Sequence, residues 1–167
     1  PRLMDSLAET FPGCRIRALY GASEAEPISL LNYEDITERE RGGMKEGKGL
    51  LVGNKVNEIE IKINGETGEI SVKGENVLKG YLQDNDNGKN SDSDMEKWHD
   101  TGDTGYLDNG GRLFLLGRLK GIIRIKGQVY YPFSIETAFS FCKGIKKSAL
   151  AVKDNRLYLI IERKKGF

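Results

Sequence analysis

The chain has 167 residues, with 26 basic and 25 acidic side chains and a formal net charge of +1. This length is enough to bury a core, and the balanced charge does not favour nucleic acid as a partner. Two distant cysteines, Cys14 and Cys142, indicate free thiols. The sequence also has no apolar run as long as a membrane span. Together with the free thiols, this predicts a soluble cytoplasmic protein.

The chain opens with helix and strand signals. Leu3, Leu7 and Phe11 recur every fourth residue and predict an apolar helix face that ends at Pro12-Gly13. The run CRIRALY, residues 14–20, predicts a strand that leads into a sharp turn. Residues 27–48 are polar and rich in charge, and they predict a loop region with at most a short helix.

A compact β region is predicted over about residues 45–117. In EIEIKI, residues 58–63, isoleucine alternates with charged residues, as in a half-buried strand. Asn64-Gly65 favours a turn into a second strand through Ile70 and Val72. Residues 106–116 predict another hairpin, with its turn at 108–111.

The character of the chain changes after Arg118. Residues 121–132 predict a two-stranded ribbon that turns near Gly127, and Pro132 suits the first turn of a helix. Residues 148–164 predict two strands around Asp154-Asn155. We interpret residues 121–167 as the first part of a small α+β domain. Because the chain starts and stops abruptly, we expect a piece of a longer protein.

Three motif lookalikes are better explained without a ligand. GKGLLVG, residues 47–53, has the wrong spacing for a dinucleotide loop and predicts a turn into a strand. QDNDNGKNSDSD, residues 83–94, has Gln83 in place of the first carboxylate of a calcium loop and Asp94 in place of the bidentate Glu, and it predicts a polar loop. His99, the single histidine, has no nearby Ser or Cys partner in the sequence and predicts a hydrogen-bonding role.

Two segments offer nucleotide chemistry. In YGASEAE, Tyr20 supplies an aromatic face for a planar ring, Gly21 allows close backbone approach, Ser23 offers a hydroxyl to phosphate and Glu24 offers a hard oxygen ligand to Mg²⁺. Alone, this pattern is equally explained by a structural turn after a strand.

The second segment adds a carboxylate and a guanidinium. In Thr101-Gly102-Asp103 the Asp103 oxygens can accept both hydroxyls of a ribose, and Arg118 has a fork suited to phosphate or ribose oxygens. Taken singly, each is also explained as an ordinary surface charge. Together with Tyr20 and Glu24, the set predicts a nucleotide site.

Three motifs occur in this order along the chain: YGASE, GEISVKGENVLKGYL and WHDTGDTGYLDNGGRLFLLGRLKGIIRIKGQVYYPFSIE, within a resemblance that runs from about residue 1 to residue 163. They resemble successive motifs of the adenylate-forming (AMP-binding) superfamily, in its acyl-CoA synthetase and acyl-AMP ligase branch. The resemblance implies a mixed α+β (α/β) fold in three parts. Residues 1–117 would be the C-terminal part of the large domain, 118–120 the hinge, and 121–167 the start of the small C-terminal domain.

The resemblance also implies a role for each matched residue. Tyr20 would pack on adenine, with Gly21 beside it, while Ser23 would contact phosphate in place of the usual threonine. Glu24 would be the catalytic residue that holds Mg²⁺, and Asp103 and Arg118 would bind the ribose. Lys120 would be the hinge residue of the catalytic cycle, and Lys126 and Gly127 would lie on the side that faces the thiol or CoA.

In the implied reaction a small carboxylic acid attacks the α-phosphate of ATP, which releases pyrophosphate and gives an acyl-adenylate. The acyl group then passes to a thiol. YGASEAEP resembles ligases of fatty or β-hydroxy acids more than amino-acid-activating domains. Coenzyme A, an acyl carrier protein and an internal hydroxyl all remain possible acceptors. The alternative is a non-catalytic module that keeps the fold to bind adenylates or partners.

Two features of the family are not found in this sequence. These are the Ser/Thr/Gly-rich phosphate loop, expected upstream of Tyr20, and the C-terminal lysine that contacts the α-phosphate, expected beyond Phe167. Thr104 also replaces the aliphatic residue that usually follows the TGD turn. We therefore expect the chain alone to lack ligase activity.

Overall fold

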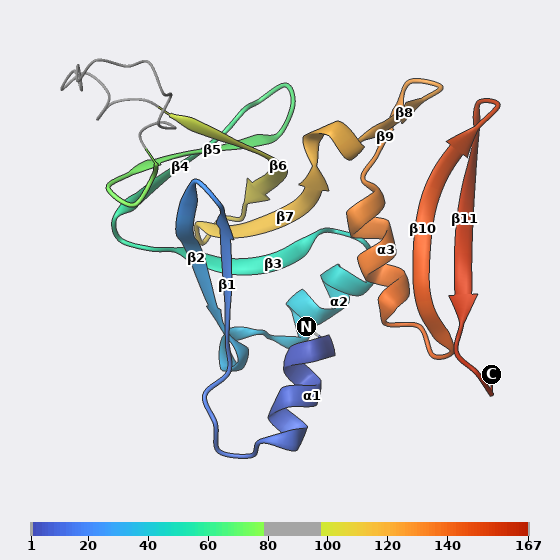
Figure 1. Cartoon of the computed structure of the whole chain (residues 1–167), viewed down its shortest axis with the longest axis horizontal. Coiled ribbons are helices and arrows are strands. Elements are labelled where there is room, and N and C mark those ends of the chain that lie inside the picture. The colour runs from blue at the N-terminus through green and yellow to red at the C-terminus, as the bar shows by residue number, and fades with distance from the viewer. Residues whose placement is uncertain (1, 79–97, 167) are drawn as a thin grey trace, which may run out of the picture.

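The computed structural model describes residues 2–78 and 98–166 (Figure 1). The calcium-loop lookalike at residues 83–94 lies outside this part. The helices are α1 (Arg2–Thr10), α2 (Glu38–Lys45) and α3 (Pro132–Ser140). The strands are β1 (Arg17–Ala22), β2 (Ala25–Asn32), β3 (Leu50–Lys55), β4 (Ile59–Ile63), β5 (Glu69–Gly74), β6 (His99–Leu107), β7 (Arg112–Arg118), β8 (Ile123–Ile125), β9 (Gln128–Tyr130), β10 (Ile145–Lys153) and β11 (Arg156–Arg163).

A large antiparallel sheet dominates the described residues. Its seven strands run in the order β1-β2-β3-β7-β6-β5-β4. The predicted hairpins β4–β5 and β6–β7 are confirmed, with Ile61 opposite Val72 and Tyr106 opposite Phe114. The predicted mixed α+β fold is confirmed. The sheet also includes β1 and β2, which precede the predicted β region at 45–117.

Both faces of this sheet are covered. Because successive side chains of a strand point to opposite faces, Val52 and Leu113 join one apolar cluster while their neighbours Leu51 and Phe114 join another. The second cluster takes in helix residues from α1 and α2, and Figure 1 shows both helices on one side of the sheet. The first cluster contains Tyr20, so the candidate site borders this core.

The expectation of a loop region at residues 27–48 was wrong for residues 27–32, which belong to β2, whereas the short helix that it allowed is α2. Most of this segment forms β2 and α2, because Ile28 and Leu31 find apolar neighbours on opposite faces of the sheet. α2 begins with a capping box in which the Thr37 side chain accepts from the Glu40 N–H and the Glu40 side chain accepts from the Thr37 N–H. Thr37 followed three residues later by Glu40 is a helix-start signal in the sequence, and it was missed.

The predicted helix at the start of the chain is confirmed as α1, but its buried face differs from the prediction. Met4 is 8% exposed, whereas Leu3 is 74% and Phe11 54% exposed. The four-residue spacing therefore located the helix, while packing against Leu31 and Met44 selected Met4 as the residue it buries.

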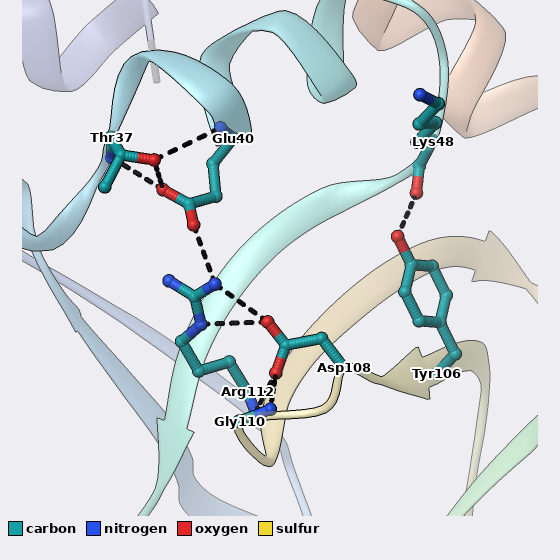
Figure 2. A network of polar contacts seen from close by, with 7 residues as sticks. All are labelled: Thr37, Glu40, Lys48, Tyr106, Asp108, Gly110 and Arg112. Atoms are coloured by element: carbon teal, nitrogen blue, oxygen red, sulfur yellow. Dashed lines mark hydrogen bonds and ion pairs between the residues drawn. The ribbon is translucent and has the colours of Figure 1, made fainter.

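A polar network fastens α2 to the turn between β6 and β7 (Figure 2). Arg112 Nη2 lies 2.7 Å from Glu40 Oε1 and 2.8 Å from Asp108 Oδ2. Burial opposes ionisation of Glu40, but hydrogen bonds from Thr37 and Arg112 outweigh it and lower the pKa of the Glu40 carboxyl. The network therefore holds a charged carboxylate at the inner face of α2.

The segment after β7 forms the predicted ribbon, helix and hairpin. The β8–β9 turn is Lys126-Gly127, with φ of 49° and 76°, and the β10–β11 turn is Asp154-Asn155, with φ of 48° and 57°. Two successive positive φ values are typical of tight hairpin turns. α3 begins at Pro132 as predicted and packs on β7 and β10.

Gly117 makes the approach of α3 to β7 possible. Its φ is 131°, and a Cβ there would lie 2.7 Å from the Cβ of Phe133. The Ser134 hydroxyl also donates to the Leu116 carbonyl, at 3.1 Å.

No helix in the described part of the chain is long and apolar enough to span a membrane.

Candidate nucleotide-binding site

Asp103 is the centre of the candidate site. Its side chain is 10% exposed, and its Oδ1 lies 3.1 Å from Nε of Arg118, the residue opposite it in the β6–β7 register. The Asp103 N–H donates to the Thr101 hydroxyl, which itself donates to the Ile70 carbonyl. The TGD turn, with Gly102 at φ 70°, therefore presents its carboxylate in a fixed place.

Tyr20, on β1, contacts the same carboxylate although β1 and β6 are not neighbouring strands of the sheet. Its hydroxyl donates to Asp103 Oδ2 at 2.9 Å, across 83 residues of sequence. Burial, and then the negative charge of Asp103, raise the pKa of the Tyr20 phenol well above its ordinary value. The sequence predicted Tyr20 as a ring platform. It did not predict that the hydroxyl would be held by Asp103.

A pocket of about 420 Å³ opens beside this pair. Small-ligand pockets usually measure about 300–1,000 Å³, so a nucleoside is of suitable size. Four predicted nucleotide-binding residues line it: Tyr20, Gly21, Asp103 and Arg118. The structure thus brings together residues from β1, β6 and β7 that lie far apart in the sequence.

Gly21 also has a structural reason to be glycine. It lies at the irregularity in the β1–β2 register between Tyr20 and Ala22. A Cβ there would lie 3.0 Å from the Ala25 carbonyl oxygen and 3.0 Å from Cγ of Glu26. The backbone of Gly21 therefore lies close to the β2 strand of its own hairpin, and it also borders the pocket.

Ser23 and Glu24 form the turn between β1 and β2, and neither lines the pocket. Oε2 of Glu24 lies 3.8 Å from Nε2 of His99, and the Glu24 carbonyl accepts from the Leu78 N–H at 2.6 Å. The Glu24 side chain is 25% exposed and so is open to solvent in part.

A magnesium ion is compatible with this turn. Among the described residues, no three His, Cys, Asp or Glu side chains lie close enough together to hold a metal by themselves. Mg²⁺, however, usually binds one or two carboxylates and takes its other ligands from phosphate and water. A single partly exposed carboxylate at Glu24 fits that pattern.

The predicted hinge and thiol-side residues do not line the pocket. Lys120 is exposed in the short 3₁₀ helix Leu119–Gly121, and its neighbour Gly121 lines the pocket. Lys126 and Gly127 are exposed at the tip of the β8–β9 ribbon.

Sequence reasoning missed the pocket residues that come from α3 and the residue before it. Tyr131, Phe133 and Glu136 line this pocket together with Tyr20. Glu136 also accepts a hydrogen bond from the Leu150 N–H at 2.8 Å, which ties α3 to β10. The YYPFSIE passage was the available signal, since it predicted the start of a helix and formed part of the superfamily motif, but no role in the pocket was predicted for it.

The chain has many curated relatives. It is 32% identical over 165 residues to 4-coumarate:CoA ligase 1 of Petunia hybrida, covering 92% of this chain and 29% of that protein. It is 30% identical over 164 residues to 4-coumarate--CoA ligase 3 of Oryza sativa subsp. japonica, covering 92% of this chain and 28% of that protein. No protein-family model matches the chain. The chain belongs to the adenylate-forming superfamily.

Solved structures of this superfamily share the fold. O-succinylbenzoate coenzyme A synthetase from Bacillus subtilis superposes with a TM-score of 0.69 at 27% identity, over 98% of this chain and 36% of that one. Coronafacic acid ligase from Pectobacterium brasiliense gives a TM-score of 0.73 at 24% identity, over 99% of this chain and 32% of that one. The chain spans from a quarter to about half the length of the curated relatives it matches.

Proposed function

We propose that this chain is part of an ATP-dependent ligase that activates a carboxylic acid as an acyl-adenylate and passes it to a thiol such as coenzyme A. The observation that carries the proposal is the convergence of Tyr20, Asp103 and Arg118 on one pocket of nucleoside size. The curated relatives are acid–CoA ligases by name, which supports the same reaction class.

Within this reaction the described residues act on the nucleoside. Asp103 accepts the ribose hydroxyls, and the adjacent Arg118 guanidinium compensates its charge. Tyr20 and Gly21 border the base, and Ser23 donates its hydroxyl to a phosphate oxygen. A related synthetase from Bacillus subtilis, 27% identical to this chain, was solved with the acyl-adenylate intermediate OSB-AMP.

Glu24 is the proposed ligand of Mg²⁺. When bound, the ion would stabilise negative charge on the phosphates during attack by the carboxylate. Lys120 is the proposed hinge, because a single exposed turn between β7 and β8 can absorb a change in backbone direction. Lys126 and Gly127 are proposed to face the thiol after such a rotation. CoA is the preferred acceptor, and an acyl carrier protein is the alternative.

The acid is proposed to be a small molecule, and two observations point to different classes of acid. The relatives are named for 4-coumarate, whereas the YGASEAEP segment favours fatty or β-hydroxy acids. The exposed free thiols Cys14 and Cys142 support a reducing compartment, which we take to be the cytoplasm.

Acid-dependent exchange of labelled pyrophosphate into ATP tests the proposal. It should be run on the 167-residue chain and on a longer protein that contains it, with 4-coumarate, O-succinylbenzoate and fatty acids of graded length. We expect exchange with at least one acid in the longer protein, and its loss in Asp103→Ala. The 167-residue chain itself is expected to bind AMP without catalysing exchange.

Two outcomes would change the assignment. Binding of an acyl-adenylate mimic without exchange for any acid would favour a non-catalytic adenylate-binding module. Absence of both binding and exchange would reject the nucleotide site itself.

A further inference from the structure

Tyr20 is buried in a way that a simple ring platform does not require. Only 9% of the residue is exposed, and its ring packs with Ile28 and Leu113 in the first apolar cluster. Its hydroxyl nevertheless meets a carboxylate at 2.9 Å. A phenol that reaches a charged acceptor from inside a core fixes the position of that acceptor.

The Asp103 carboxylate is held on both of its oxygens. Oδ2 accepts from the Tyr20 hydroxyl, and Oδ1 lies 3.1 Å from Nε of Arg118. The two partners come from β1 and β7, which are not neighbours in the sheet, and both line the pocket. Rotation of the carboxylate about its own axis would break both contacts, so its plane is set by Tyr20 and Arg118 together.

The remaining capacity of this carboxylate suits two neighbouring hydroxyls. A carboxylate oxygen has about two acceptor positions, so Oδ1 and Oδ2 each keep one after their protein contacts. Two acceptors at a fixed spacing match the two donors of a vicinal diol. A ligand with a single hydroxyl can use only one of them.

We propose that the Tyr20 hydroxyl is a positioning group that sets the Asp103 carboxylate for a vicinal diol and so makes this site prefer ribose over deoxyribose nucleotides. The inference rests on the proposed nucleotide function and adds the source of its sugar selectivity. Tyr20 acts here through Asp103, and its hydroxyl makes no contact with the sugar.

The test compares the affinities of AMP and 2′-deoxy-AMP for the 167-residue chain, measured by amide NMR titration into the millimolar range. Wild-type chain should bind AMP more tightly. Tyr20→Phe keeps the ring and removes the hydroxyl, and should weaken AMP binding by about 2- to 10-fold, the value of one such hydrogen bond. It should leave 2′-deoxy-AMP binding nearly unchanged, so the ratio of the two affinities falls.

Tyr33→Phe is the matched control. Its hydroxyl also donates to a carboxylate, Asp5 Oδ1 at 3.0 Å, outside the pocket. This variant should leave both affinities unchanged. In an Asp103→Asn background, Tyr20→Phe should have no further effect on the affinity ratio, because Tyr20 acts through Asp103.

The outcomes separate the proposal from the function on which it rests. Equal weakening of both ligands by Tyr20→Phe would reduce Tyr20 to a packing residue and overturn the proposal, while the nucleotide site would stand. A wild-type chain that binds neither nucleotide would reject the site itself. If Tyr20→Phe does not fold, Asp103→Asn decides alone, and an unchanged preference for AMP in that variant would overturn the proposal.

Discussion

At the scale of single residues, the fold keeps the Tyr20 phenol protonated. Burial disfavours the phenolate, and the adjacent Asp103 charge disfavours it further, so the pKa of Tyr20 is raised above its ordinary value of 10.0. An unfolded chain would release this proton at about pH 10. The stability that this group contributes is therefore full below pH 10 and is lost as the pH rises through the folded-state pKa.

A titration of tyrosine ¹³Cζ shifts checks this assignment among the seven tyrosines. We expect the Tyr20 signal to remain that of a phenol at pH 10, when an exposed tyrosine is half ionised. Asp103→Asn should lower the pKa of Tyr20 in part, because burial remains. A Tyr20 signal that shifts at about pH 10 in the wild-type chain would contradict the buried hydrogen bond.

Gly117→Ala tests the contact between β7 and α3. A Cβ there would meet the Cβ of Phe133 at 2.7 Å, and φ is 131°. We expect a loss of about 1–3 kcal/mol in the free energy of unfolding from backbone strain, with further loss from the clash. Urea unfolding measures it.

Gly111→Ala is the control for this substitution. Gly111 also has positive φ, 76°, but a Cβ there would meet nothing within 4 Å. It should therefore cost the strain alone. If both variants lose the same stability, the contact between Gly117 and Phe133 does not limit how α3 packs.

At the scale of elements, the Glu40–Arg112–Asp108 network joins α2 to the β6–β7 turn. The pKa of Glu40 is lowered from 4.5 despite burial, because Thr37 and Arg112 hydrogen-bond the charged form. The stability it contributes is present above about pH 4.5 and is lost as the pH falls through the lower folded-state pKa. The contact between α2 and the sheet thus depends on the negative charge of Glu40, which is lost when the carboxylate is protonated at low pH.

Glu40→Gln should remove part of the acid dependence of stability. The neutral amide keeps the shape of the side chain but loses the charged contact with Arg112, at a cost of about 1–3 kcal/mol near neutral pH. Urea unfolding at pH 7 and at pH 4 should show a smaller difference between the two pH values than in the wild-type chain. Glu34→Gln, at an exposed carboxylate outside the network, is the control. An identical pH profile in Glu40→Gln would mean that Glu40 does not carry this dependence.

At the scale of the whole molecule, the large apolar side chains exposed in the described part of the chain include two groups. Leu3, Phe11 and Leu19 are more than half exposed on or near α1 and β1. On the β10–β11 hairpin, Val152, Tyr158, Ile160 and Ile161 are between 43% and 59% exposed. Exposed apolar surface and an unpaired edge strand favour association.

We therefore expect the purified chain to self-associate with increasing concentration. Ile160→Thr keeps a β-branched side chain on β11 and reduces its apolar surface, so it should lower the associated fraction without loss of fold. Sedimentation velocity over a concentration series measures this effect. Asn155→Asp, in the turn of the same hairpin, is the control for a surface change. A chain that stays monomeric throughout would contradict the prediction.

The sequence by itself determined the features that depend only on residues close together in the chain, namely the positions of strands, helix starts and turns. Alternation in EIEIKI located β4, Pro132 located the start of α3, and Asp154-Asn155 located the last hairpin turn, because strand periodicity and turn chemistry act within a few residues. Its ordered motifs also indicated the superfamily and predicted Tyr20, Gly21, Asp103 and Arg118, which line the candidate pocket.

Only the tertiary structure decided burial and distant pairing. It chose Met4 over Leu3 for the core, placed residues 27–32 in β2, and brought the Tyr20 hydroxyl to Asp103. It also brought Phe133 and Glu136 to the pocket wall. These outcomes depend on the register of strands far apart in the chain and on which faces pack together, and no local pattern contains that information.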